Sequence, residues 1–201
     1  MIAVVDYGAG NVCSVMHALE HIGAPSILTR EEGEIARADA VILPGVGAFG
    51  DAMAQLGASG TIAALERYRQ TGRPMLGICI GEQLLFDRSE ESPGSPGLAW
   101  LRGSVRRIPA APERKVPHMG WNSLQILKDD PLFRHVRDGE YVYYVHSFYA
   151  RDCAAGTLAA SRYGNVDVTG VVRRGNVYGT QFHPEKSGDT GLRLLRAFAE
   201  L

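Results

Sequence analysis

A cysteine lies between two glycines in the stretch Gly-Ile-Cys-Ile-Gly, residues 77–81. This spacing is typical of a nucleophile elbow, a tight strand-to-helix turn that holds its central residue in a strained conformation and needs glycine on both sides. Residues 74–78 are apolar and strand-like, whereas residues 82–86 favour a helix. The N-terminus of a helix stabilises a nearby thiolate. The pattern predicts that Cys79 is a nucleophile; the alternative is a cysteine packed in a core strand.

A nucleophilic cysteine needs a base, and His183 is the strongest candidate among the six histidines. Pro184 disfavours a helical conformation for His183, so His183 and Glu185 should project to the same side of an extended segment. A carboxylate there fixes the imidazole tautomer and stabilises its protonated form. We therefore predict a triad of Cys79, His183 and Glu185. A surface ion pair is one alternative, and a metal site is another, although no further ligand cluster accompanies it.

The elements expected to position these residues alternate in the first half of the chain. Short apolar runs at residues 2–5, 26–29, 40–43 and 74–78 read as strands buried on both faces. Apolar side chains repeat at helical spacing from Val12 to Ile22, where Gly23 ends the pattern. The alternation predicts a parallel sheet with helices on both faces.

The second half reads as additional strands at 104–108, 124–127, 141–149, 157–162, 166–173 and 177–182. A hairpin turn is expected at 174–176 and a last helix at 191–200. Residues 93–97 read as a loop rather than a domain boundary. We predict an α/β fold with an open, mostly parallel central sheet flanked by helices, antiparallel additions in the C-terminal half, and a single domain over residues 1–201.

The composition argues against several classes of partner. Of the 201 residues, 45% are hydrophobic and 21% charged, and the net charge of −1 provides no field for nucleic acid or anionic lipid. No apolar run approaches the roughly 20 residues of a membrane span, and the N-terminus lacks a basic leader, so we expect a cytoplasmic protein. The three cysteines lack metal-type spacing. Neither a metal nor an organic cofactor is expected.

Several motifs together resemble one family. The stretch Gly-Ile-Cys-Ile-Gly-Glu-Gln-Leu-Leu-Phe at 77–86, and Gln-Phe-His-Pro-Glu-Lys-Ser at 181–187, resemble the triad-type, or class I, glutamine amidotransferases. The motifs at 6–11, 44–50, 89–91 and 117–122 extend this resemblance over nearly the whole chain. They are most similar to the members that supply a cyclase subunit in histidine biosynthesis. The resemblance implies hydrolysis of glutamine and transfer of ammonia to a partner.

The resemblance also implies roles for individual residues. Cys79 would attack the amide, His183 would carry the proton and Glu185 would orient His183. Backbone donors for the oxyanion would come from Val46 or Gly47, in a segment that could switch its peptide orientation, and from Ile80. The glutamine substrate would be bound by Gln83, Glu91, His146, Ser147 and Phe148.

The implied partner is a cyclase subunit with a (β/α)₈ barrel, in a heterodimer. The residues that fit a surface facing it are Asn11, His118, Trp121, Asn122 and Lys186. Trp121 is the candidate anchor, since aromatic residues concentrate at interfaces, although a core position is the alternative. The chain departs from the family at Glu82, usually methionine, and at Ile80, usually leucine. We expect Glu82 to point outward or to pair elsewhere.

Three alternatives remain at the level of sequence. The chain could be a paralogue that supplies ammonia to a different acceptor, a catalytically silent regulatory subunit, or a cysteine hydrolase acting on esters. The complete set of Cys79, His183 and Glu185 argues against the silent subunit. Gln83 and Glu91 argue against the ester hydrolase.

Overall fold

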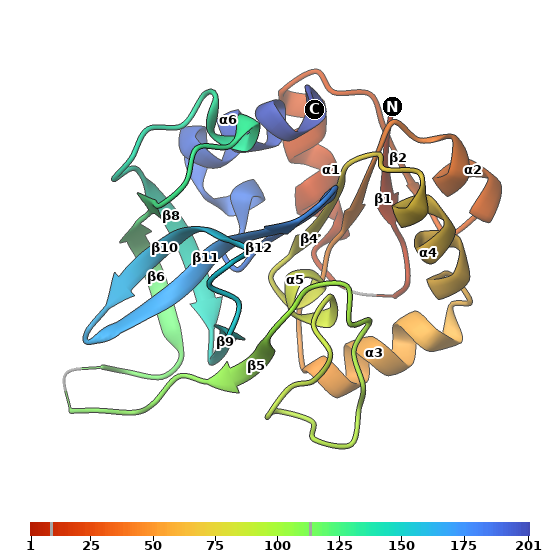
Figure 1. Cartoon of the computed structure of the whole chain (residues 1–201). Helices are drawn as coiled ribbons and strands as arrows, with labels where there is room; N and C mark the ends of the chain where they lie inside the picture. Colours follow the sequence, from red (N-terminus) through yellow and green to blue (C-terminus); the bar gives the residue numbers. More distant parts are fainter. Residues whose placement is uncertain (9, 113) are drawn as a thin grey trace.

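Strands from both halves of the chain form one central sheet in the computed structural model, which describes residues 1–8, 10–112 and 114–201. The strand order is β2-β1-β3-β4-β12-β11-β10-β7 (Figure 1). The strands paired in parallel are β1 (Ile2–Val5), β2 (Ser26–Thr29), β3 (Ala40–Leu43), β4 (Met75–Ile78) and β12 (Val177–Thr180). The antiparallel strands are β11 (Val166–Arg174), β10 (Thr157–Tyr163) and β7 (Gln125–Ile126).

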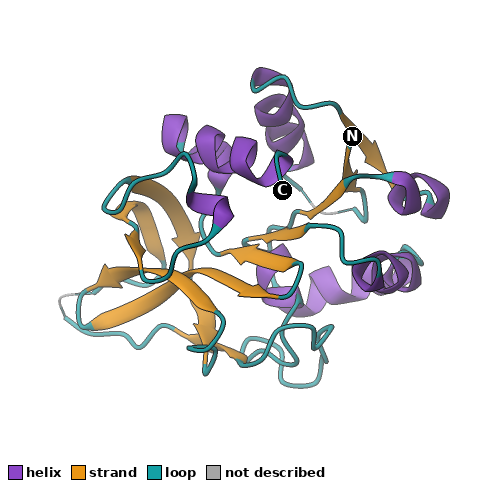
Figure 2. Cartoon of the chain, turned by 45° about the horizontal axis from the view of Figure 1, so that its top comes forward, coloured by secondary structure: helices purple, strands orange, loops and turns teal. Residues whose placement is uncertain are grey.

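Helices cover both faces of this sheet (Figure 2). One set contains α1 (Val12–His21) and α6 (Gly188–Ala199). The other contains α2 (Glu32–Arg37), α3 (Phe49–Ala58), α4 (Ile62–Gln70) and α5 (Ile80–Leu84). Every residue of β1, β3 and β4 is buried, as expected for parallel strands covered on both sides. The predicted α/β fold, with its mostly parallel sheet and antiparallel additions, is confirmed.

Two smaller antiparallel sheets flank the C-terminal half. One pairs β6 (His118–Ser123) with β8 (Tyr141–His146), and the other pairs β5 (Ser104–Arg107) with β9 (Phe148–Arg151). The expected strand 141–149 is therefore two strands, which separate at Ser147. Because each strand pairs with a different partner, the chain turns between them. This turn lies beside the candidate site.

Other element boundaries differ from those expected. Strand β6 was not anticipated, because its polar residues and Gly120 give no apolar alternation, and the expected strand 124–127 shrinks to β7. The last helix begins at Gly188 rather than at residue 191. Short 3₁₀ turns lie at Pro131–Phe133 (η1) and Pro184–Lys186 (η2). The hairpin between β11 and β12 is as predicted, with Gly175 at φ 63°.

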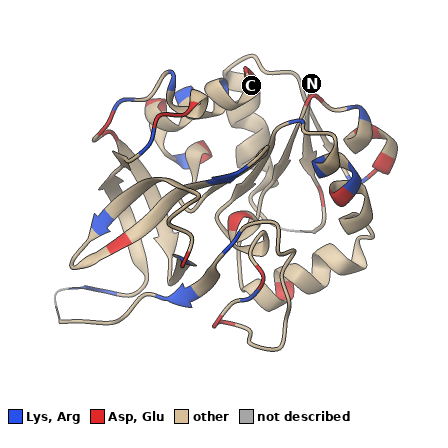
Figure 3. Ribbon diagram, in the orientation of Figure 1, with Lys and Arg blue, Asp and Glu red and all other residues tan. Residues whose placement is uncertain are grey.

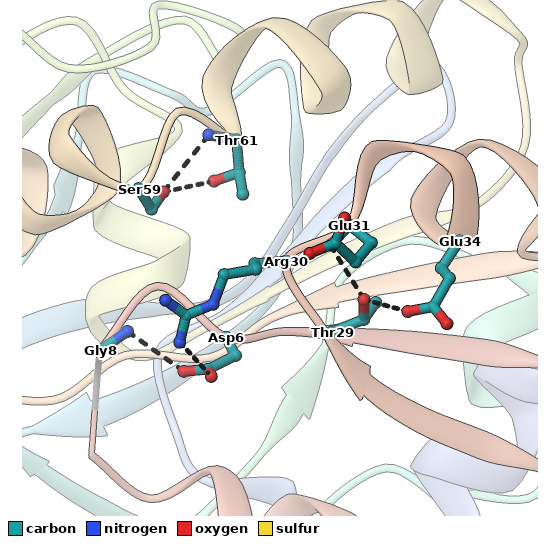
Figure 4. Close-up of polar contacts among 8 residues, drawn as sticks. All are labelled: Asp6, Gly8, Thr29, Arg30, Glu31, Glu34, Ser59 and Thr61. Carbon is teal, nitrogen blue, oxygen red and sulfur yellow. Dashed lines mark hydrogen bonds and ion pairs between the residues drawn. The ribbon is translucent and has the colours of Figure 1, made fainter.

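Polar contacts hold the carboxyl ends of β1 and β2 together (Figure 4). Arg30 Nη2 contacts Asp6 Oδ2 at 2.8 Å, and the Gly8 amide donates to Asp6 Oδ1 at 3.3 Å. Thr29 Oγ1 accepts from the amide of Glu31 at 2.9 Å. The chain therefore leaves β1 from an anchored end on its way to helix α1.

Charged residues are interspersed over helices, strands and loops rather than gathered by sign (Figure 3). This agrees with the small net charge of −1. Among the helices of the described residues, none combines the length and the apolar character that crossing a membrane would need.

Candidate active site

Cys79 lies in the tight turn between β4 and α5, where the sequence predicts a nucleophile elbow. Its backbone has φ 56° and ψ −110°, a region that side-chain-bearing residues rarely adopt. The flanking glycines are required sterically. A Cβ on Gly81 would overlap the Leu43 carbonyl oxygen, and one on Gly77 would lie 2.6 Å from the Gly81 carbonyl oxygen. The Cys79 amide donates to the Thr180 carbonyl at 2.8 Å, which ties the elbow to β12.

His183 and Glu185 form a buried pair beside this elbow. The distance from His183 Nδ1 to Glu185 Oε1 is 2.7 Å, and the two side chains are 1% and 0% exposed. His183 is extended, with φ −96° and ψ 98°, as Pro184 led us to expect. However, Glu185 reaches His183 through the 3₁₀ turn η2 rather than by alternation along a strand. Ser187 Oγ secures this turn by donating to the His183 carbonyl at 2.6 Å.

The electrostatics of His183 favour its protonated form. Burial lowers the pKa of His183, but the neighbouring Cys79 and Glu185 side chains outweigh burial and raise that pKa above its ordinary value. Because the carboxylate of Glu185 accepts a hydrogen bond from Nδ1, Nε2 is left to exchange a proton. Within the described part of the chain, His183 Nε2 is buried and has no hydrogen-bond partner. His183 lines the same cavity as Cys79.

Asn11 adds a fourth residue to this constellation. Its side-chain amide donates to Glu185 Oε1, the same oxygen that contacts His183. Asn11 adopts a left-handed conformation with φ 74° at the start of α1. The sequence pattern assigned Asn11 to the partner surface and missed its contact with Glu185, because the two residues are far apart in the chain.

A cavity of about 290 Å³ opens over the thiol. All the predicted residues of the triad, the oxyanion segment and the substrate site line it, except Glu185, which lies behind His183. The lining residues are Val46, Gly47, Cys79, Ile80, Gln83, Glu91, Pro117, Val145, His146, Ser147, Phe148, His183 and Lys186.

Two of the predicted substrate residues are held in place by the protein. Gln83 Nε2 donates to the Phe148 carbonyl at 3.0 Å and to Gln181 Oε1 at 2.9 Å. Gln83 Oε1 is buried and has no partner among the described residues, so it is free to accept from a ligand. Glu91 Oε2 accepts from the Phe49 amide at 2.7 Å, at the N-terminus of α3. Glu91 thus offers carboxylate oxygens, which suit an ammonium group.

The predicted oxyanion segment lies beside the thiol. Val46 is 37% exposed, and Gly47 has φ 98° with no atom within 4 Å of the place a Cβ would occupy. In contrast, Gly45 is confined, because a Cβ there would lie 2.7 Å from both the Gly81 amide nitrogen and the Tyr7 hydroxyl. The Ile80 amide belongs to the first turn of α5 and therefore has no acceptor within the helix. The segment combines a fixed start with a tip that has room to turn.

The residues expected at the partner surface differ in exposure. Trp121 is 55% exposed and makes an edge contact with Tyr143, so its side chain is not in the core. Asn122 is half-buried, whereas Lys186 is exposed and lies at the cavity. His118 is only 2% exposed, and its ring contacts His146 at 2.9 Å instead of facing a partner. The side chain of His118 therefore does not belong to the exposed face.

Glu82 does not behave as expected. Helix α5 is buried on all sides, and the Glu82 side chain is 1% exposed and packs against Gly179 of β12. It faces away from the cavity, but it points into the core rather than outward. Neither carboxyl oxygen has a partner among the described residues. Burial raises the pKa of Glu82 to about 8, so the carboxyl is mostly protonated at neutral pH.

Gln181 is a site residue that the sequence reasoning missed. Its Nε2 lies 3.9 Å from the Cys79 sulfur, and its Oε1 accepts from Gln83. The only signal was its position two residues before His183. Over the described ranges, no cluster of His, Cys, Asp or Glu is arranged to hold a metal ion.

The chain is similar over nearly its whole length to known proteins. The family model "Glutamine amidotransferase class-I" matches residues 3–200. The imidazole glycerol phosphate synthase subunit HisH of Methanosarcina acetivorans is 49% identical over 202 residues, covering 100% of this chain and 98% of that protein. The protein of the same name from Bacillus cytotoxicus is 48% identical and covers 98% of this chain and 93% of its own length.

Solved structures show the same fold. A crystal structure of a glutamine amidotransferase matches with a TM-score of 0.77 at 23% identity, covering 100% of this chain and 98% of that one. A second match, PurLQS from Thermotoga maritima, has a TM-score of 0.74 at 20% identity and covers 99% and 97% of the two chains. This chain belongs to the class-I glutamine amidotransferase family.

Proposed function

We propose that the chain is the glutaminase subunit of an imidazole glycerol phosphate synthase. It hydrolyses glutamine to glutamate and ammonia, and a cyclase subunit uses the ammonia to form imidazole glycerol phosphate and an aminoimidazole carboxamide nucleotide in histidine biosynthesis. The observation that carries the proposal is the convergence of Cys79, His183 and Glu185 at one cavity. The full-length relatives at 46–49% identity, named as HisH subunits, support the choice of pathway.

In the proposed reaction, His183 Nε2 holds the proton of the Cys79 thiol, and the Cys79 sulfur attacks the side-chain amide carbon of glutamine. The C–N bond then breaks as Nε2 returns that proton to the departing nitrogen, which leaves as ammonia. Water attacks the resulting thioester after giving a proton to Nε2, and glutamate leaves as the sulfur is reprotonated. Glu185 keeps Nδ1 protonated throughout, so Nε2 is always the exchanging atom.

The charge that develops on the attacked carbonyl oxygen needs backbone donors. The Ile80 amide supplies one, since it is adjacent to the nucleophile at the start of α5. Val46 or Gly47 supplies the second after its peptide turns toward the cavity, which the open surroundings of Gly47 permit. A partner that stabilises the turned peptide would increase turnover by stabilising the oxyanion.

The proposed partner surface consists of Asn11, Trp121, Asn122 and Lys186, of which Lys186 lines the cavity. Docking of a (β/α)₈-barrel cyclase there would cover the cavity and confine ammonia, which loses its nucleophilicity when it is protonated in bulk water. We also propose that residues 1–201 act as one domain in the cytoplasm, where the Cys79 thiol stays reduced.

Glutamate release from glutamine tests this function in three mixtures: the chain alone, the chain with the cyclase subunit, and the pair with its nucleotide substrate. The Cys79→Ala variant provides the control. Strong activation in the complete mixture, absent in Cys79→Ala, is expected. A well-assembled pair that shows no activation would exclude this partner and favour a glutaminase for another acceptor.

A further inference from the structure

Two buried histidines next to the candidate site have no part in the proposed reaction. His118 and His146 are register partners on β6 and β8, and they are 2% and 6% exposed. Their rings meet with His118 Nδ1 at 2.9 Å from His146 Nε2. Burial without a charged partner is costly for an imidazolium, so such a pair is expected to be neutral.

The hydrogen bonds around the pair fix the position of every ring proton. The Phe148 carbonyl only accepts, so His146 Nδ1, at 2.8 Å, must carry a hydrogen. Burial lowers the pKa of His146 to about 3 and that of His118 to about 4, so each ring carries a single N–H at neutral pH. His146 Nε2 therefore accepts from His118 Nδ1. His118 Nε2 in turn accepts from the Asn122 side-chain amide at 3.3 Å.

The result is a chain of hydrogen bonds with one direction, which runs from Asn122 through His118 and His146 to the carbonyl of Phe148. Its first member is itself held, because Asn122 Nδ2 also donates to the Arg162 carbonyl at 3.0 Å. The ring of His118 is stacked between Tyr144 and Tyr163, with centroid distances of 4.6 Å and 3.9 Å. These contacts leave the two rings little freedom to reorient.

This chain of hydrogen bonds ends at the turn between β8 and β9, which lines the cavity. The Phe148 carbonyl accepts from His146 on one side and from Gln83 on the other. The Ser147 carbonyl accepts from the Ile108 amide at 2.9 Å. The two successive carbonyls of Ser147 and Phe148 are thus held by donors from Ile108, His146 and Gln83. Both residues lie where the proposed site would bind the glutamine main chain.

We infer that His118 and His146 are positioning residues, which hold the Ser147–Phe148 backbone in the orientation that binds the α-carboxylate of glutamine. Neither histidine needs to touch the substrate, and the Cys79 thiol is not part of this series of hydrogen bonds. The inference rests on the proposed function, because it takes glutamine as the ligand. Loss of these hydrogen bonds should weaken recognition of the amino-acid end of the substrate, while the reactivity of Cys79 stays unchanged.

Alkylation of Cys79 by the glutamine analogue 6-diazo-5-oxo-L-norleucine separates these two effects. Its saturation constant measures recognition of the amino-acid end, and its limiting rate measures the reactivity of the Cys79 thiol. Iodoacetamide, which lacks the α-carboxylate and α-ammonium groups, is the matched probe for the thiol alone. In His118→Leu we expect the saturation constant to rise about ten-fold, with the limiting rate and the iodoacetamide rate unchanged. His118→Asn keeps a donor near the position of Nδ1 and should stay within about two-fold of the wild type.

A His118→Leu protein with an unchanged saturation constant would overturn the inference. So would a parallel loss in all three measurements, which would indicate a role in folding only. Asn122→Ala gives a second test that leaves both rings in place. Its saturation constant should rise about two- to three-fold, and a larger rise than in His118→Leu would also contradict the proposed direction of the chain. If 6-diazo-5-oxo-L-norleucine does not saturate the wild type at Cys79, the proposed function fails, and the inference with it.

Discussion

Replacing Glu82 with glutamine should make the chain more stable at neutral and alkaline pH. The pKa of Glu82 is raised to about 8 in the folded state from an ordinary 4.5, because the side chain is buried and its oxygens have no partner among the described residues. Between these two values the folded state keeps a proton that the unfolded chain has lost. The contribution of Glu82 is therefore most favourable below pH 4.5 and is lost as the pH rises through 8.

The size of the effect follows from linkage. Between the two pKa values, each pH unit lowers the free energy of unfolding by about 1.4 kcal/mol. The ionisable carboxyl therefore lowers it by about 3 kcal/mol at pH 7, and this loss approaches about 5 kcal/mol above pH 8. Glutamine has nearly the same shape and does not ionise. The gain in the free energy of unfolding of Glu82→Gln over the wild type should therefore grow by about 3 kcal/mol between pH 5 and pH 8.

Urea unfolding of both proteins at pH 5, 6, 7 and 8 measures this difference, and titrations common to the two proteins cancel. Glu20→Gln, on the exposed face of α1, is the matched control and should show no comparable growth. A difference between Glu82→Gln and the wild type that stays constant with pH would refute the reasoning. Because Glu82 faces away from the cavity, Glu82→Met should leave glutamine turnover nearly unchanged, and a large gain would contradict this placement.

Three further changes test other parts of the structure. Asn11→Ala removes a donor to Glu185 Oε1 and should lower kcat for glutamine about ten-fold or more in steady-state assays, with circular dichroism as the check on folding. Gly81→Ala forces a Cβ against the Leu43 carbonyl and should lower the free energy of unfolding by about 3 kcal/mol, whereas Gly57→Ala, where a Cβ has open space, should not destabilise. Trp121→Ala should weaken partner binding by about 2 kcal/mol in calorimetry without changing the chain's own iodoacetamide reactivity.

Much of the fold could be predicted from local pattern. The buried parallel strands are short and continuously apolar, and the glycines beside Cys79 have a steric reason that is visible in their spacing. Strand β6 could not be recognised in this way, because it alternates in burial with polar residues and a glycine. The division of 141–149 into β8 and β9 also escaped prediction, since it depends on which strands each half pairs with.

Local sequence pattern also predicted only part of the candidate site. Cys79, His183 and Glu185 could be proposed because each belongs to a short motif with a chemical meaning. The contact between Asn11 and Glu185 joins residues 174 positions apart, and no local pattern predicts it. The resemblance placed His118 on the partner surface, and Glu82 was expected to point outward or to pair elsewhere, but tertiary packing buries both side chains. Burial of polar groups is set by the fold and not by the residue type.

Mass spectrometry of the alkylated cysteines tests the central claim most directly. The chain has three free cysteines, of which Cys13 is exposed while Cys79 and Cys153 are buried, so exposure alone predicts labelling at Cys13. We expect that 6-diazo-5-oxo-L-norleucine labels Cys79, that glutamine slows this labelling, and that His183→Ala abolishes it. Labelling confined to Cys13, or labelling of Cys79 that glutamine does not slow, would contradict a glutaminase site at this elbow.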